Sequence, residues 1–263
     1  MPNHDSYRKT VSITIEACVT SVRSALAAQQ GGADRVELCD NLTEGGTTPG
    51  PGSILAARRY LDIGLNVIIR PRGRDFLYTD LEFEIMRRDI EFCREHGVDG
   101  VVFGVQEPDG RIDTRRTGLL KEAAGSMSTT FHRAFDVCRD PFEALEALSI
   151  LGIDRILTSG QQADAVAGAD LIAQLVTRAG DRIVIMPGVG IDAGNIKNLI
   201  SRTRAQEYHV YASRQFPGGM TFHNTRVFMG TDPSLSEYHL DLTDPASIRA
   251  IRDAADSALA SHS

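Results

Sequence analysis

The stretch Gly32-Ala33-Asp34-Arg35-Val36 decides the fold, because its pattern returns as Gly97-Val98-Asp99-Gly100-Val101 and as Gly152-Ile153-Asp154-Arg155-Ile156. In each copy a glycine is followed by an apolar residue, an aspartate and a short β-branched run. Glycine adopts the left-handed conformation that ends a helix, and the apolar residue can pack back on the last turn. The three copies therefore predict three equivalent helix-to-strand turns.

Further β-branched runs lie on both sides of these turns, separated by segments of helical periodicity. Strict alternation of strands and helices indicates parallel pairing, and eight units in one chain predict an α/β protein with a (β/α)8 TIM barrel. A doubly wound open sheet shares the alternation, but no G-x-G-x-x-G fingerprint follows the first strand. The expected strands are 13–19, 35–39, 66–70, 100–104, 129–132, 155–158, 182–186 and 207–212. The expected helices are 21–30, 54–61, 80–95, 114–124, 141–151, 169–179, 195–201 and 245–259.

We expect residues 1–263 to form a single TIM-barrel domain without a linker. Strand-helix repeats occupy about 11–213, a long loop occupies 214–244, and a C-terminal helix occupies 245–259. Segments that follow barrel strands lie at the C-terminal mouth, where lids occur. We therefore expect 214–244 to lie over the mouth.

Composition excludes several classes of protein. The 263 residues carry 28 Lys and Arg against 35 Asp and Glu, a formal charge of −7, without any block of basic residues. Nucleic acids and anionic membranes bind basic surfaces, so we expect neither partner. No apolar run approaches the roughly 18 residues of a membrane span, and the polar start lacks a signal-peptide segment. We expect a cytoplasmic protein whose four cysteines are thiols.

Alternation along the strands predicts which side chains face the barrel interior. Residues that face the helices must be apolar, while the residues between them point to the barrel axis. On the first strand Ile15 and Ala17 face outward, so Glu16 points inward. Active sites of this fold lie at the C-terminal ends of the strands. The inward set is Glu16, Cys18, Glu37, Cys39, Arg70, Arg72, His132 and His209.

The charged members of this set have two interpretations. In a structural one, Arg70 bridges Glu16 and Glu37 across neighbouring strands, because buried charges need partners. In a catalytic one, two carboxylates, two arginines and two imidazoles exceed what pairing requires and support acid–base chemistry on an anionic substrate. The candidate catalytic residues are Glu16, Glu37, Arg70, Arg72, His132 and His209.

Cys18 and Cys39 occupy matching inward positions on adjacent strands. Their sulfurs can then lie close enough to bind one soft ion, and two thiolates suit copper(I). Pairs of small inward residues also serve as packing, so both interpretations stay open. We expect no organic cofactor.

A glycine loop and a helix N-terminus follow the seventh strand. Gly188 and Gly190 lie in the loop, Asn195 opens the helix, and Ser213 and Arg214 end the eighth strand. Backbone amides of such a loop form the usual phosphate cradle after strands seven and eight of a barrel. We predict that these five residues bind a small anion; the alternative is that the glycines only form a tight turn.

The chain also resembles a known family. It resembles the copper homeostasis protein CutC family from about residue 11 to about 213, in the motifs Ile15-Glu16-Ala17-Cys18, Gly31-Gly32-Ala33-Asp34-Arg35-Val36-Glu37-Leu38-Cys39, Glu44-Gly45-Gly46-Thr47-Thr48-Pro49, Arg70-Pro71-Arg72-Gly73, Asp75-Phe76-Leu77-Tyr78, Asp99-Gly100-Val101-Val102-Phe103-Gly104, Phe131-His132-Arg133-Ala134-Phe135-Asp136, Leu157-Thr158-Ser159-Gly160 and Met186-Pro187-Gly188. The resemblance implies a cytoplasmic, often oligomeric (β/α)8 barrel with a role in copper homeostasis, and Cu(I) binding at Cys18 and Cys39. The family ends its eighth strand with a histidine, a small residue and a serine, whereas here His209 and Ser213 are separated by Val210-Tyr211-Ala212.

Two functions follow from these observations. One is a CutC-like barrel protein that binds Cu(I) in copper homeostasis. The alternative is a cofactor-independent enzyme, an isomerase, lyase or hydrolase that acts on a small phosphorylated or carboxylated metabolite. Copper handling requires the two thiols, whereas an enzyme requires the carboxylates, His132 and the arginines. We expect a small anionic ligand and a homo-oligomer.

Overall fold

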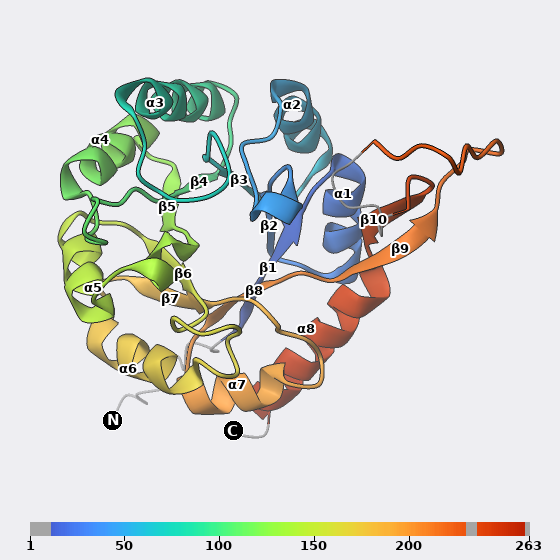
Figure 1. The fold of residues 1–263 in the computed structure, drawn as a ribbon. Coiled ribbons are helices and arrows are strands. Elements are labelled where there is room, and N and C mark those ends of the chain that lie inside the picture. Colours follow the sequence, from blue (N-terminus) through green and yellow to red (C-terminus); the bar gives the residue numbers. More distant parts are fainter. Residues whose placement is uncertain (1–11, 230–235, 261–263) are drawn as a thin grey trace, which may run out of the picture.

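The computed structural model describes residues 12–229 and 236–260. Eight parallel strands alternate with helices around one axis, which confirms the (β/α)8 barrel (Figure 1). Consecutive strands pair from β1 to β7, β1 also pairs with β8, and a bridge from Gly188 to His209 joins the end of β7 to β8. The barrel strands are β1 (Thr14–Val19), β2 (Arg35–Leu38), β3 (Gly64–Ile68), β4 (Gly100–Phe103), β5 (Ser128–Phe131), β6 (Arg155–Thr158), β7 (Val184–Pro187) and β8 (Glu207–Val210). The helices are α1 (Val22–Gly31), α2 (Pro51–Tyr60), α3 (Asp80–Glu95), α4 (Thr114–Ala124), α5 (Pro141–Ile150), α6 (Ala169–Ala179), α7 (Ile196–Thr203) and α8 (Pro245–Ala260).

The three repeated turns share one set of contacts at the N-terminal end of the barrel. Each glycine has a positive φ, between 68° and 92°, which a residue with a side chain rarely adopts. Each aspartate then accepts a hydrogen bond of 2.7–2.8 Å from a backbone N–H of the preceding strand, in the pairs Asp34 with Ile15, Asp99 with Leu65 and Asp154 with Thr129. Each carboxylate also pairs with a basic side chain, in the same order Arg252, Arg58 and Lys121. The sequence repeat is therefore a structural repeat that fastens each turn to its neighbouring strand.

The outward side chains of the strands form the core between the barrel and its helices. These residues are fully or almost fully buried, as the alternation predicts: Ile15, Ala17, Val36, Leu38, Leu65, Val67, Val101, Phe103, Phe131, Ile156, Tyr208 and Val210. Removing apolar surface from water stabilises such a layer by about 25 cal/mol for each Å². The residues that alternate with these apolar residues along the strands therefore face the barrel axis.

The described residues of 214–244, which are 214–229 and 236–244, do not form the lid expected from the sequence. The segment contains β9 (Ser213–Pro217) and β10 (His239–Thr243), which pair antiparallel with Ser213 opposite Thr243. The hairpin lies beside α1, outside the ring of helices, instead of over the mouth (Figure 1). The Thr243 N–H donates to Ser24 Oγ on α1 at 3.2 Å, so the end of the hairpin is bound to α1. Residues 230–235 lie outside the described part. The expectation of a long loop over the mouth is wrong.

Helix α8 completes the ring between α7 and α1. Arg252 on α8 donates to the carbonyl of Ile13 at 2.6 Å and to that of Gly32 at 3.2 Å, so it joins the helix to the start of β1 and the end of α1. Among the helices of the described residues, none is both long enough and apolar enough to cross a bilayer.

Candidate functional site

A cavity of about 630 Å³ opens at the C-terminal ends of the barrel strands. Ile68, Phe76 and Leu157 contribute apolar side chains to its wall. Six of the eight predicted inward residues line it: Cys18, Glu37, Cys39, Arg70, His132 and His209. A seventh, Glu16, is completely buried. The strands thus bring together most of the set that alternation predicts.

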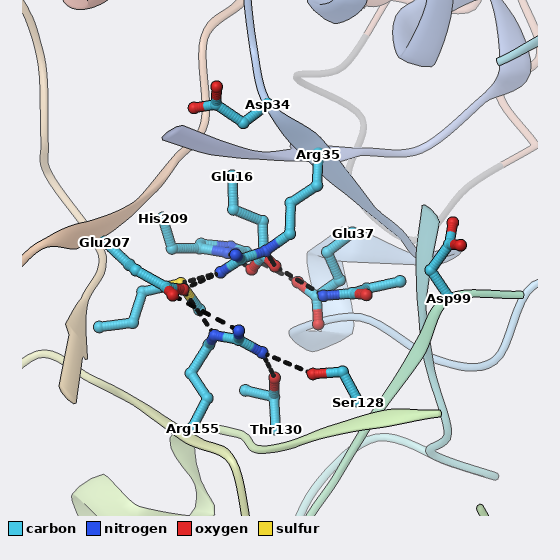
Figure 2. A network of polar contacts seen from close by, with 12 residues as sticks. Glu16, Asp34, Arg35, Glu37, Asp99, Ser128, Thr130, Arg155, Glu207 and His209 are labelled. Atoms are coloured by element: carbon cyan, nitrogen blue, oxygen red, sulfur yellow. Dashed lines mark hydrogen bonds and ion pairs between the residues drawn. The ribbon is translucent and has the colours of Figure 1, made fainter. Parts of the chain in front are cut away.

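A network of ion pairs fills the barrel interior around Glu16 (Figure 2). Its Oε2 atom accepts from Arg35 Nε at 2.5 Å and from Asn66 Nδ2 at 2.8 Å. Glu207 accepts from both Arg35 and Arg155, the latter at 2.6 Å from Nε. Burial alone would raise the pKa of Glu16, but Arg35 and the hydrogen bond from His209 hold it well below its usual range. These contacts tie the Glu16 carboxylate into the interior network, and its charge is stabilised there.

His209 connects this network to the cavity. Its Nδ1 atom lies 2.7 Å from Glu16 Oε1, and its Nε2 atom lies 3.5 Å from Glu37 Oε2. Burial lowers the pKa of His209, but the hydrogen bond and charges of the two carboxylates raise it overall. Burial raises the pKa of Glu37 to about 7, partly offset by His209. A histidine oriented by one carboxylate and facing a second one near neutral pKa is suited to moving a proton.

Cys18 and Cys39 meet as predicted, with their Sγ atoms 3.7 Å apart. One ligand atom from each of Cys18, Glu37 and His209 lies within 4.8 Å of the others, so these side chains could hold a metal ion. The hydrogen bond with Cys39 and burial raise the pKa of the Cys18 thiol well above its usual range. A bound metal would therefore have to displace the Cys18 proton. Thiol and imidazole donors that converge in this way fit a soft metal ion.

Arg70 lines the cavity but does not bridge the two glutamates. Its Nη1 atom donates to the carbonyls of Glu44 and Gly46, and its Nη2 atom donates to that of Arg74, each at 2.8 Å. Its guanidinium lies 5.0 Å from the ring centre of Phe76. The bridging interpretation is wrong for Arg70, because Arg35 forms the ion pair with Glu16 instead.

His132 is the other buried cationic candidate, and it is held neutral. The backbone N–H of Ala134 donates to Nδ1 at 3.1 Å, so the ring proton resides on Nε2. Burial, Arg70 and Arg133 lower the pKa of His132 to about 3. The Nε2 atom is buried and has no hydrogen-bond partner among the described residues. His132 therefore presents a fixed N–H donor.

Arg72 does not reach the cavity, contrary to the prediction. It donates to Glu82 Oε1 at 2.6 Å and to Asp75 Oδ1 at 2.9 Å, and its side chain is one-third exposed. Strand β3 ends at Ile68, so strand alternation no longer sets the direction of a side chain four residues later.

The five residues of the predicted anion site are not brought together. Gly190 lines the cavity, but Asn195 donates its side-chain N–H to the Gly190 carbonyl at 2.7 Å. Gly188 pairs with His209, while Ser213 and Arg214 belong to β9. Arg214 is mostly exposed and lies 3.5 Å from Asp244. The five residues therefore do not form one cluster, and anion binding by the loop itself stays a prediction.

Sequence reasoning missed a layer of polar side chains that lies inside the barrel near the starts of the strands. Arg35 and Glu207 each lie two residues before a predicted inward residue, so the same alternation could have identified them. Asn66 and Arg155 complete the layer, and Arg155 also donates to Ser128 and Thr130. What the pattern could not reveal is which of these side chains meet across the axis.

Related sequences match this chain over most of its length. The CutC family model matches residues 13–214. A CutC family protein of Chromobacterium violaceum is 48% identical over 244 residues, which are 93% of this chain and 98% of that protein. The copper homeostasis protein cutC homolog of Homo sapiens is 45% identical over 237 residues, which are 90% of this chain and 87% of the human protein.

Solved structures agree with the sequence comparison. The crystal structure of the copper homeostasis protein CutC of Streptococcus agalactiae has a TM-score of 0.72 at 36% identity, and the match covers 75% of this chain and 97% of that one. Phosphoribosylanthranilate isomerase of Thermotoga maritima has a TM-score of 0.56 at 14% identity, over 93% of this chain, and shares the fold alone. With the family model matched over residues 13–214 and relatives 45–48% identical over at least 90% of its length, the chain belongs to the CutC family.

Proposed function

We propose that this chain binds Cu(I) at the mouth of the barrel through Cys18 and Cys39, with His209 as a third ligand. The observation that carries the proposal is the 3.7 Å separation of two buried sulfurs on the wall of the cavity. The naming of the human relative for copper homeostasis supports it.

The donor types favour a soft ion. Thiolates select Cu(I) or Zn²⁺ over hard cations, and imidazole suits both metals. Glu37 offers a carboxylate oxygen to the same space, which Zn²⁺ accepts more readily than Cu(I) does. Zn²⁺ is therefore the metal against which Cu(I) must be compared.

The test is an anaerobic titration of the reduced protein with Cu(I) against a competing chelator. We expect one Cu(I) per chain, and an affinity lower by about tenfold or more in Cys18→Ser and in Cys39→Ser. Cys138→Ser is the matched control, because Cys138 is a buried thiol that does not line the cavity. Unchanged affinity in both cavity variants, or tighter binding of Zn²⁺ than of Cu(I), would contradict the proposal.

A second function is acid–base catalysis on a small anionic molecule by a cofactor-independent isomerase, lyase or hydrolase. Glu37 favours it, because its pKa is raised to about 7 beside a histidine oriented by Glu16. We expect the protein to exchange deuterium from heavy water into the carbon-bound hydrogens of small 2-oxo or 2-hydroxy carboxylates. Glu37→Gln should abolish this exchange, and a wild-type protein that exchanges none of them argues against catalysis of this kind.

A further inference from the structure

Polar atoms without partners concentrate around the cavity. Five buried side-chain nitrogen or oxygen atoms lack a hydrogen-bond partner within the described residues, and three of them are Glu37 Oε1, Arg70 Nε and His132 Nε2. All three residues line the cavity. A buried polar atom without a partner destabilises a protein, so such atoms are rare unless something else completes their hydrogen bonds. Two donors and one acceptor at a single cavity point to a ligand.

The charge of Arg70 gives the same indication. Arg70 is 4% exposed, and no carboxylate pairs with it in the described part of the chain. Its hydrogen bonds go to main-chain carbonyls, which accept its protons but carry no net charge. Arg133 also lines the cavity, but it is paired with Asp136 at 2.8 Å. Arg70 is therefore the buried cation that an anion would neutralise.

Phe76 lies with its ring close to both donor residues, Arg70 and His132. Its ring lies 5.0 Å from the Arg70 guanidinium and 4.9 Å from the centre of the His132 ring. The Ala134 N–H occupies His132 Nδ1, so the ring can only donate at Nε2. The Arg70 guanidinium and the His132 ring therefore both lie against the Phe76 ring, which lines the cavity.

We propose that the cavity binds a small hydroxy carboxylate, whose carboxylate lies against His132 Nε2 and Arg70 and whose hydroxyl group donates to Glu37 Oε1. The carbon skeleton would pack on Ile68, Phe76 and Leu157. This inference deepens the acid–base function proposed above by naming its substrate class, and it does not depend on copper.

The number of donors favours a carboxylate over a phosphate. Two unpartnered N–H groups match the two oxygens of a carboxylate. A phosphate would bring a further oxygen and more charge, and would need further donors. Asn195 and Arg214 do not supply them, because the Asn195 side chain donates to the Gly190 carbonyl and Arg214 does not line the cavity. An anion with one charge fits the single unpaired guanidinium.

The test is calorimetric titration of the metal-free full chain with glycolate, glycerate and gluconate. Glycolamide serves as the uncharged analogue of glycolate, and inorganic phosphate serves as the competing anion. We expect at least one hydroxy carboxylate to bind and to shift the Nε2–H signal of His132 in the protein labelled with ¹⁵N-histidine. Its uncharged amide and phosphate should each bind at least tenfold more weakly.

Variants separate the site from general effects. His132→Phe keeps a ring but removes the donor and should weaken binding at least tenfold, while His132→Gln restores an N–H and should recover part of the affinity. Arg70→Gln provides a second variant if His132→Phe does not fold. The matched control is His96→Phe, at the residue after the end of α3 and away from the cavity, which should bind as wild type does. Absence of binding to all three carboxylates, equal binding of phosphate, or unchanged binding in both His132→Phe and Arg70→Gln overturns the inference.

The two proposed functions fail in different ways. If Cys18→Ser loses Cu(I) but keeps the carboxylate, the two sites are separate. If the carboxylate binds without any deuterium exchange, the ligand site stands and acid–base catalysis fails.

Discussion

Glu16 on β1 and His209 on β8 are register partners, and their side chains meet at 2.7 Å across the pair of strands that joins the first and last units of the barrel. The contact spans 193 residues of sequence. It holds the imidazole in one orientation, with Nε2 toward Glu37. The same pair of side chains thus contributes to barrel closure and to the geometry of the mouth.

Glu16→Gln should destabilise the fold by about 3–5 kcal/mol, because it removes a charge that pairs with the buried Arg35. The midpoint of urea unfolding at pH 7 measures this loss. The change Glu84→Gln on the exposed face of α3 is the control, since its surface pair with Arg88 should contribute less than about 1 kcal/mol. Equal losses in the two variants would show that Glu16 is not structural.

Glu37→Gln should stabilise the protein above neutral pH. Burial raises the pKa of Glu37 from 4.5 to about 7 in the folded state, so the folded protein holds this proton where the unfolded chain has released it. The resulting penalty grows from pH 4.5 to pH 7 and reaches about 3 kcal/mol above it, because each unit of the shift is worth about 1.4 kcal/mol. Urea unfolding of wild type and variant at pH 5 and pH 8 should show the larger gain at pH 8. A larger gain at pH 5 would contradict the assignment.

His132 should make the wild-type protein sensitive to acid. Its folded pKa of about 3 lies below the usual value of 6.5, so its contribution is full above pH 6.5 and is lost as the pH falls toward 3. At pH 4 the loss is about 3 kcal/mol, because each pH unit in this window is worth about 1.4 kcal/mol. Denaturant unfolding of His132→Gln from pH 7 to pH 4 should give a flatter curve than wild type. Parallel curves would show that His132 is protonated in the folded state.

Asp154→Ala should cost about 1–3 kcal/mol, because it leaves the Thr129 N–H without its acceptor at the start of β5. Asp99→Ala should cost a similar amount, since the turns are equivalent. Asp109→Ala is the control, because its partners Arg111 and Arg139 are surface groups. Thermal unfolding measures all three, and a loss confined to one turn would show that the repeat is not equivalent in energy.

The apparent affinity for Cu(I) should rise by at least about tenfold for each pH unit between 6 and 8, because the Cys18 thiol must release its proton. Chelator competition at three pH values measures the slope, after correction for protonation of the chelator. Cys18→Ser should show a shallower slope. An affinity independent of pH would exclude a thiolate ligand.

The sequence predicted the direction of side chains where the backbone is a regular strand. Cys18 and Glu37 face the cavity because alternation is a local property of β-structure. Arg72 and Arg214 were misplaced because they lie beyond the ends of β3 and β8, where the chain turns. Local patterns carry no information about the path of the chain after a strand ends.

Partners across the axis were beyond the reach of sequence reasoning. Which arginine meets Glu16 depends on strand register, and Arg35 rather than Arg70 is the register partner of Glu16 on the neighbouring strand. The free N–H of His132 was equally hidden, since it depends on a bond from the backbone of Ala134. The Glu16 pair follows from strand register, whereas the His132 contact is a local cap of the short 3₁₀ helix that follows β5.

The hairpin of β9 and β10 begins and ends at the same place, because Ser213 lies opposite Thr243 before the chain enters α8. Its length therefore hardly affects the loop-closure entropy of the barrel: doubling a flexible loop costs only about 0.6 kcal/mol. The hairpin can therefore lengthen, shorten or acquire new residues while α8 keeps its position in the ring of helices. This part of the chain is where members of such a fold can diverge at little thermodynamic cost.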